Sequence, residues 1–192
     1  MTNSDAQSLD QNSKQEWYKD GLRFSCSQCG NCCTGGPGAV WYTADEGRAM
    51  AVALGLTDEE FTAKYTRAIA DRRSLNESET PHGFDCVFLD RTSQPGRALC
   101  GVYTARPAQC RTWPFWPENL TTPKAWKAAK AKTPCHGMDN GTLYPIEQIR
   151  ILRERDHVDN HSSPLRSKSR AEYFSMSTPL PIQSLRADDH DS

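Results

Sequence analysis

The sequence predicts a small, loop-rich α+β domain in which a short β-hairpin and several short helices are stapled together by metal. Three observations lead to this prediction. Seven of the eight cysteines lie between Cys26 and Cys110, two helix-start signals follow one another after residue 42, and two short apolar runs surround a turn-rich segment at 90–96. With 192 residues, a net charge of −1 and 36% hydrophobic residues, the chain has room for one domain with a modest core.

Residues 21–158 are expected to form this domain, between a disordered tail at 1–20 and a mostly disordered tail at 159–192. Both tails are too poor in large apolar groups to offset the entropy of ordering. The amino end has no basic patch followed by an apolar stretch, which a secretory signal requires, and no apolar run approaches the ~20 residues of a membrane helix. We therefore expect a cytoplasmic protein that makes no contact with a membrane.

The first predicted elements are a short strand at 40–42 and two helices. The Thr-Ala-Asp-Glu sequence at 43–46 is a capping box that opens a helix running toward Gly55, and residues 57–60 repeat the signal. The spacing of four apolar residues predicts that the second helix faces the core. These residues are Phe61, Tyr65, Ala68 and Ile69.

The apolar runs at 86–89 and 99–103 predict the strands of the hairpin, with residues 90–96 as its turn. Each strand carries one cysteine, so that the ladder would hold two thiols close together. Further helices are expected at 124–132, at 145–155, and around Cys110. The last of these would be capped by Thr104, with Pro107 in its first turn, and would run to Arg111.

The run Cys26-Ser-Gln-Cys29-Gly-Asn-Cys32-Cys33 is the strongest functional signal. Thiolates bind zinc or iron–sulfur clusters, and a two-residue gap lets a tight turn aim both sulfurs at one centre. Gly30 and the glycines at 35, 36 and 38 supply the backbone freedom that such a turn needs, because glycine reaches positive φ without steric cost. Four more thiols form a second set: Cys86, Cys100, Cys110 and Cys135. All eight are candidate ligands, and they suit two four-cysteine sites or one multinuclear centre.

The adjacent pair Cys32 and Cys33 is unusual, because neighbouring side chains of an extended segment point to opposite faces. We expect one of the two to join Cys26 and Cys29 on one metal. The other would face a second centre, bridge two metals or be structural. The alternative for the whole set is a disulfide framework, which a reducing compartment disfavours.

The spacing of Cys26, Cys29 and Cys32 matches the opening of bacterial ferredoxins, which favours an iron–sulfur cluster such as 4Fe–4S slightly over zinc. The widely separated second ligands would suit structural zinc equally well. Two arginines that flank Cys110 could offset the negative charge of either centre, and an apolar wall could limit access of water. The candidates are Arg106 and Arg111 for the charge, and Phe24, Trp113, Phe115 and Trp116 for the wall. Of the histidines, only His136 adjoins a candidate ligand.

Together these motifs resemble the YkgJ-type cysteine-cluster family, which carries the CxxCxxCC pattern and is described as a zinc- or iron-chelating domain. The resemblance covers residues 24–137, in four blocks at 24–35, 86–89, 100–115 and 135–137. It implies a metal-binding domain with the eight cysteines as ligands. Some relatives are flagellin lysine N-methylases in which this domain is thought to carry an iron–sulfur cluster.

Three functions follow as hypotheses. The first is a metal-binding protein whose zinc or iron–sulfur centre has a structural, redox or accessory role, with a protein partner. The alternative is an enzyme that modifies protein side chains, similar to the flagellin lysine N-methylases. Binding of nucleic acid is the third, and the near-zero net charge argues against it because such affinity comes mainly from phosphate neutralisation.

Overall fold

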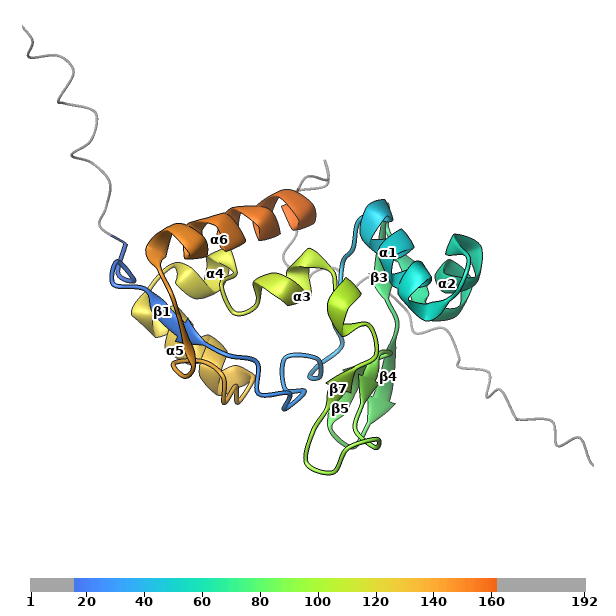
Figure 1. Ribbon diagram of the computed structural model, residues 1–192, viewed down its shortest axis with the longest axis horizontal. Coiled ribbons are helices and arrows are strands. Elements are labelled where there is room, and N and C mark those ends of the chain that lie inside the picture. The colour runs from blue at the N-terminus through green and yellow to red at the C-terminus, as the bar shows by residue number, and fades with distance from the viewer. Residues whose placement is uncertain (1–15, 162–192) are drawn as a thin grey trace, which may run out of the picture.

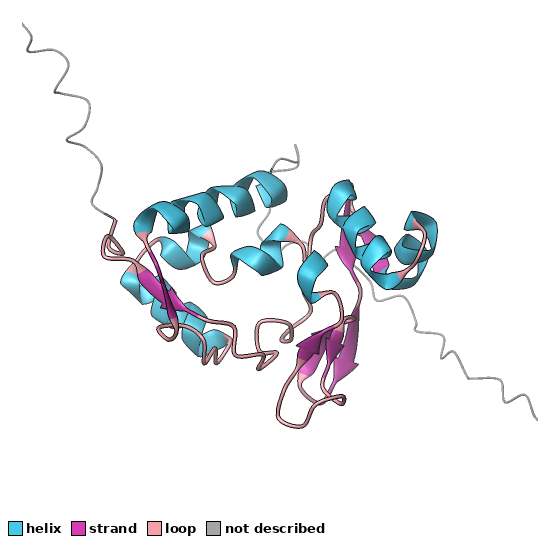
Figure 2. Ribbon diagram, viewed as in Figure 1, coloured by secondary structure: helices cyan, strands magenta, loops and turns pink. Residues whose placement is uncertain are grey.

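The computed structural model describes residues 16–161, with side chains through Arg155. Within these residues it is a small mixed α+β fold with much irregular chain (Figures 1 and 2). The helices are α1 (Ala44–Leu54), α2 (Asp58–Tyr65), the 3₁₀ turn η1 (Tyr103–Ala105), α3 (Ala108–Thr112), α4 (Pro117–Leu120), α5 (Pro123–Lys132) and α6 (Ile146–His161). The strands are β1 (Leu22–Phe24), β2 (Thr66–Ile69), β3 (Arg72–Leu75), β4 (Glu77–Thr80), β5 (Gly83–Cys86), β6 (Leu89–Asp90), β7 (Leu99–Cys100) and β8 (Thr142–Tyr144).

The strands pair antiparallel and two by two: β1 with β8, β2 with β3, β4 with β5, and β6 with β7. No helix within residues 16–161 is both long enough and apolar enough to cross a membrane. The predicted tails fall largely outside the described residues, at 1–15 and 162–192.

Two separate groups of buried side chains form the cores of the fold. The first core lies among β1, α4, α5 and α6, and the second lies between α1, α2 and the hairpins (Figure 1). The buried members of the first are Tyr18, Trp113, Phe115, Leu120, Trp126, Cys135, Met138 and Ile149. Those of the second are Met50, Ala51, Phe61, Leu75, Phe88 and Val102. Each core is small, so the stability of the whole fold depends on how the two cores contact each other.

Both predicted capping boxes are confirmed. Thr43 and Glu46 exchange side-chain and backbone hydrogen bonds at the start of α1, and α2 starts with the same exchange at 57–60. Glu46 also accepts a hydrogen bond from the Ala108 backbone N–H at 2.5 Å. The carboxylate that caps α1 therefore also fixes the start of α3.

The second helix is shorter than the apolar spacing predicts. It ends at Tyr65, because Thr66 takes extended φ and ψ and opens β2. Phe61 is buried as expected, but Ala68 and Ile69 lie on β2, where Ala68 is exposed. Pairing with β3 satisfies the backbone groups of 66–69 in place of helical hydrogen bonds.

The predicted hairpin is correct in part. Leu89 pairs with Cys100 across β6 and β7, but Cys86 belongs to β5 and pairs with Glu77 of β4. The two cysteines therefore do not share a ladder. The reason is β4, whose sequence Glu-Ser-Glu-Thr lacks the apolar alternation that predicts a strand.

Two further elements differ from the prediction. The strand at 40–42 is reduced to one bridge, between Trp41 and Ser74. Thr104 does not cap a helix: α3 begins after Pro107, and residues 103–105 form a separate 3₁₀ turn. The residue before a proline avoids the α region, and Arg106 is accordingly extended, with φ −54° and ψ 142°.

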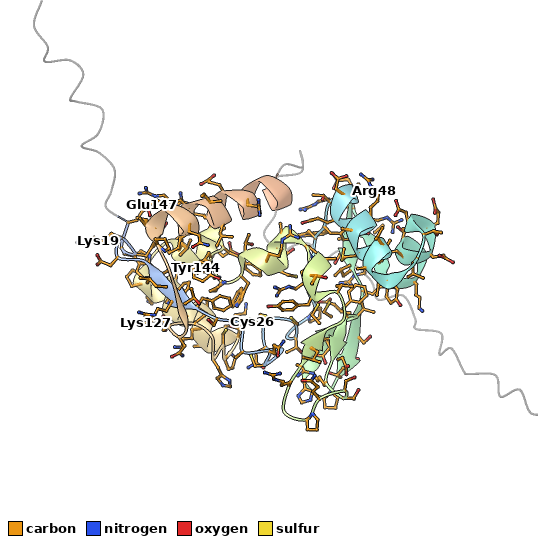
Figure 3. All side chains as sticks on the ribbon, in the orientation of Figure 1. Lys19, Cys26, Arg48, Lys127, Tyr144 and Glu147 are labelled. Carbon is orange, nitrogen blue, oxygen red and sulfur yellow. The ribbon has the colours of Figure 1, made fainter. Side chains whose placement is uncertain are left out.

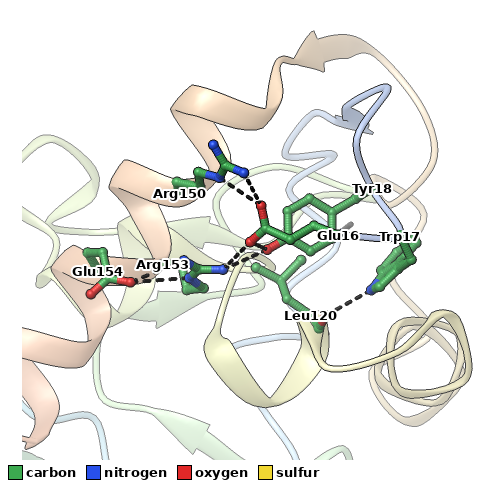
Figure 4. Close-up of polar contacts among 7 residues, drawn as sticks. All are labelled: Glu16, Trp17, Tyr18, Leu120, Arg150, Arg153 and Glu154. Carbon is green, nitrogen blue, oxygen red and sulfur yellow. Dashed lines mark hydrogen bonds and ion pairs between the residues drawn. The ribbon is translucent and has the colours of Figure 1, made fainter. Parts of the chain in front are cut away.

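Residues 16–18, which fall within the segment expected to be a tail, are packed against the rest of the fold. Tyr18 is buried in the first core, and the Trp17 indole N–H donates to the Leu120 carbonyl at 2.8 Å. Glu16 accepts hydrogen bonds from Tyr18, Arg150 and Arg153 at 2.6–2.7 Å (Figure 4). These contacts fasten the chain ahead of β1 to α6 and α4.

We expect Glu16→Gln to destabilise the protein by about 1 kcal/mol, or roughly 3 °C in Tm. Burial raises the pKa of Glu16, but hydrogen bonds from Tyr18, Arg153 and Arg150 outweigh it and hold the pKa below its ordinary value of 4.5. The folded state therefore favours the carboxylate, and this stabilisation is present above pH 4.5 and lost as the pH falls through the lowered pKa. Thermal melts across this range, with Glu79→Gln on exposed β4 as the control, measure the difference. Equal melts for the two variants at pH 7 would contradict the role of the network.

Candidate metal centre

All eight cysteines line one cavity of about 330 Å³ at the junction of the two cores. Trp113 and Cys135 of the first core contribute to its wall, as do Leu75, Phe88 and Val102 of the second. Figure 3 shows Cys26 near the middle of the molecule, between the part that contains β1 and α5 and the part that contains the hairpins. The cysteines, spread over more than a hundred positions in the sequence, therefore meet at one place.

The loop that carries the cysteine run is held by its own backbone. Gln28 and Gly30 take positive φ values of 54° and 74°, and the Cys33 N–H donates to the Gly30 carbonyl at 2.9 Å. The Gln28 carbonyl accepts from the Ala98 N–H at 2.8 Å. The loop is thus a turn of defined shape that is fastened to the chain just before β7.

Cys32 and Cys33 lie in this turn rather than in an extended segment. Their Sγ atoms are 3.7 Å apart, and both residues line the cavity. The expectation that their side chains point to opposite faces is therefore wrong, because the turn closed by Cys33 and Gly30 brings them to the same side. The contact between the two sulfurs raises the pKa of Cys32 and lowers that of Cys33.

Backbone contacts bring Cys33 to the cysteines of the hairpins. The Cys86 N–H donates to the Cys33 carbonyl at 2.9 Å, and the Gly101 N–H, next to Cys100, donates to Phe88 at 2.9 Å. Burial raises the pKa of Cys110 well above its ordinary value, and the charges of Cys33, Cys86 and Cys100 raise it further. Cys33 and three cysteines that follow it much later in the sequence are thus neighbours.

The other end of the run lies beside Cys135. The Ser25 N–H donates to the Gly137 carbonyl at 3.2 Å, and the Asn31 side chain donates to the Pro134 carbonyl at 2.9 Å. These two bonds flank Cys135 on both sides. They place the segment that contains Cys26 and Cys29 against the turn that contains Cys135.

The eight thiols differ in exposure and in ease of ionisation. Cys26 and Cys32 are exposed, Cys135 is buried, and the others are intermediate. Burial raises the pKa of Cys86 to about 12 and also raises that of Cys100. Within residues 16–161, no three His, Cys, Asp or Glu side chains are already arranged to hold one ion. The thiols form a wall around a space and do not form a finished four-ligand set.

Arginines supply positive charge at this wall. Arg106 lines the cavity, donates to the Tyr103 carbonyl at 3.0 Å and stacks 3.7 Å above the Tyr103 ring. Besides the contact with Cys32, the charges of Arg106 and Arg91 lower the pKa of Cys33. Arg111 also lines the cavity, but it pairs with Glu46 at 3.3 Å.

Arg91 was not predicted from the sequence. Its guanidinium binds Asp85 through two hydrogen bonds, at 2.7 and 3.0 Å, and is aimed by them. Asp85 lies on β5, directly before Cys86, and Arg91 directly follows β6. The pair therefore links the β4–β5 hairpin to the β6–β7 hairpin. The only signal in the sequence for this ion pair is that Asp85 adjoins a cysteine and Arg91 follows six positions later.

Of the four aromatic residues predicted for the wall, Phe24, Trp113 and Trp116 line the cavity. Phe115 instead lies in the first core, where it stacks with Trp126 at a ring separation of 6.0 Å. His136 is exposed and is absent from the cavity wall. Its position beside Cys135 does not bring it to the other thiols.

Residues 25–136 match a family model named CxxCxxCC, described as "Putative zinc- or iron-chelating domain". The chain belongs to this family. The match confirms the resemblance inferred from the cysteine motifs, and it supports binding of metal as the broad function of the CxxCxxCC domain. No solved structure matches the chain.

We expect Gly30→Ala to damage the centre. The φ of +74° costs a non-glycine residue about 1–2 kcal/mol, and a new Cβ would lie 2.6 Å from the Cβ of Ala98. The matched control is Gly36→Ala, whose Cβ would meet no atom within 4 Å. Thermal melts and metal content after purification measure both variants. Equal metal content and Tm in G30A and G36A would contradict this account of the loop.

Proposed function

We propose that the protein binds metal in this cavity through its eight cysteines, and that the centre has a structural or a redox and accessory role. The observation that carries the proposal is that all eight cysteines line one cavity. Thiolates are the protein ligands that zinc and iron–sulfur clusters share. Membership in a family described as zinc- or iron-chelating supports the same conclusion.

The size of the cavity favours a centre larger than one ion. A volume of about 330 Å³ is many times the roughly 15 Å³ that one water-sized sphere needs. A wall of eight thiols around such a space suits an iron–sulfur cluster or more than one metal. We therefore retain the slight preference for iron–sulfur over zinc.

The backbone contacts suggest how the thiols divide. The sulfurs of Cys32 and Cys33 are in contact. Before this pair, Asn31 is bonded to the turn that contains Cys135, and after it, Gly35 is bonded to β5. We assign Cys26, Cys29, Cys32 and Cys135 to one set, and Cys33, Cys86, Cys100 and Cys110 to the other. The adjacent pair would then join two four-thiol sets, either as two sites or as the two sides of one multinuclear centre.

The charge around the cavity is consistent with a thiolate-bound metal. A metal or cluster held by four thiolates commonly keeps a net negative charge, which nearby cations stabilise most where water is excluded. Arg106 and Arg91 supply such charge beside Cys33. No observation within residues 16–161 favours the alternative activity, modification of protein side chains, which stays a hypothesis from the sequence.

Anaerobic purification followed by metal and acid-labile sulfide analysis tests the proposal. We expect more than one metal per chain, and iron with sulfide and visible absorption if the centre is an iron–sulfur cluster. Zinc without colour would retain the metal-binding function and assign the centre to zinc. Protein free of metal, with its thiols in disulfides, would overturn the proposal.

We also expect folding to depend on metal. A ligand held at a thousand times its Kd stabilises the native state by about 4 kcal/mol, and the two small cores meet at the cavity. Cys33→Ser should therefore lose metal and melt at lower temperature, as should the wild type after chelation. Ser78→Ala, exposed on β4 and outside the cavity wall, is the control. Apo and loaded protein with the same Tm would contradict this dependence.

A further inference from the structure

The indole N–H of Trp113 is buried and has no hydrogen-bond partner among residues 16–161. Three other indoles differ from it in this respect. Trp17 donates to the Leu120 carbonyl at 2.8 Å, Trp116 to the Gln109 carbonyl at 2.9 Å, and Trp126 to Asp139 at 2.7 Å. Buried donors are nearly always paired, so an unpaired one needs an explanation.

The position of Trp113 offers that explanation. Its side chain is 6% exposed and lines the cavity of the eight thiols, immediately after α3, which carries Cys110. No polar group of the described part of the chain forms a hydrogen bond with Nε1. The ring borders the space in which the thiols would hold a centre, which makes a ligating sulfur the candidate acceptor.

We propose that Trp113 Nε1 donates a hydrogen bond to a cysteine thiolate of the bound centre. The inference rests on the proposed metal-binding function and adds a positioning and tuning residue to it. A hydrogen bond to a ligating sulfur withdraws electron density from the metal. In an iron–sulfur centre such a bond raises the reduction potential.

One competing arrangement lies within the chain. Trp116 makes an edge-to-face contact with Trp113, with ring centroids 4.8 Å apart and an interplanar angle of 78°. An N–H resting on an aromatic face gains only a weak interaction. That contact exists with or without metal, so the response of Nε1–H to metal separates the two arrangements.

The first experiment uses Co²⁺ as the probe, loaded anaerobically into the full chain as wild type, Trp113→Phe and Trp126→Phe. Trp126 is an equally buried indole of the first core outside the cavity wall, which makes it the matched control. We expect the sulfur-to-cobalt charge-transfer band of W113F to move to longer wavelength, because the thiolate loses a hydrogen bond. The band of W126F should match the wild type. An unmoved band in W113F would overturn the inference.

The second experiment needs no variant that must fold. In wild-type protein labelled with ¹⁵N-tryptophan, loading with Cd²⁺ should move one indole N–H resonance far more than the others. That resonance should be the one that is absent from the spectrum of W113F. If W113F does not fold, Trp113 is identified as the resonance that remains once the other indoles are assigned. An indole that does not respond while Cd²⁺ binds would show that Nε1–H rests on Trp116 and would overturn the inference alone. Failure of the wild type to bind either metal would overturn the proposed function as well.

Discussion

The packing of two small cores around a shared wall of thiols is the constraint on which the rest of the structure depends. The first core reaches this wall through Trp113 and Cys135, and the second through Leu75, Phe88 and Val102. Buried thiols that carry charge repel one another, and burial already raises the pKa of Cys86 to about 12. A bound metal would replace this repulsion by metal–sulfur bonds that join the two cores, which couples folding to metal.

The loop at 26–35 is where this coupling is organised. Ser25 and Asn31 bond it to the turn around Cys135, and Gln28 bonds it to Ala98 just before β7. Its end is bonded to β5 through the Cys86 N–H and the Phe84 N–H, which donate to the Cys33 and Gly35 carbonyls. The positive φ of Gly30 allows one tight turn to contact both the segment around Cys135 and the hairpins.

The sequence predicts those features of the fold and the site that depend on residues close together in the chain. The capping boxes at 43–46 and 57–60 act within one turn and are confirmed, and the cysteine motif identifies the family. Elements that depend on distant pairing were missed: β1 with β8 joins residues more than a hundred positions apart, and the polar β4 gives no alternation. The same limit hid Arg91, whose place at the thiols depends on how two hairpins pack. The side-by-side sulfurs of Cys32 and Cys33 were missed because a turn, not an extended segment, holds them.

The groups around the thiols bear on whether the proposed centre is only structural. A structural zinc site needs four ligands and little else, whereas the reactivity of a redox centre depends on charge and hydrogen bonds around its sulfurs. Here Arg106 lines the wall, Arg91 is oriented by the two hydrogen bonds that it donates to Asp85, and Trp113 has an unpaired buried donor. Keeping a buried N–H unpaired costs about 1–3 kcal/mol, which is a large fraction of the stability of a small domain. If the cavity binds metal as proposed, this donor lies where a hydrogen bond to a ligating sulfur would tune the centre, which favours the redox role among those proposed.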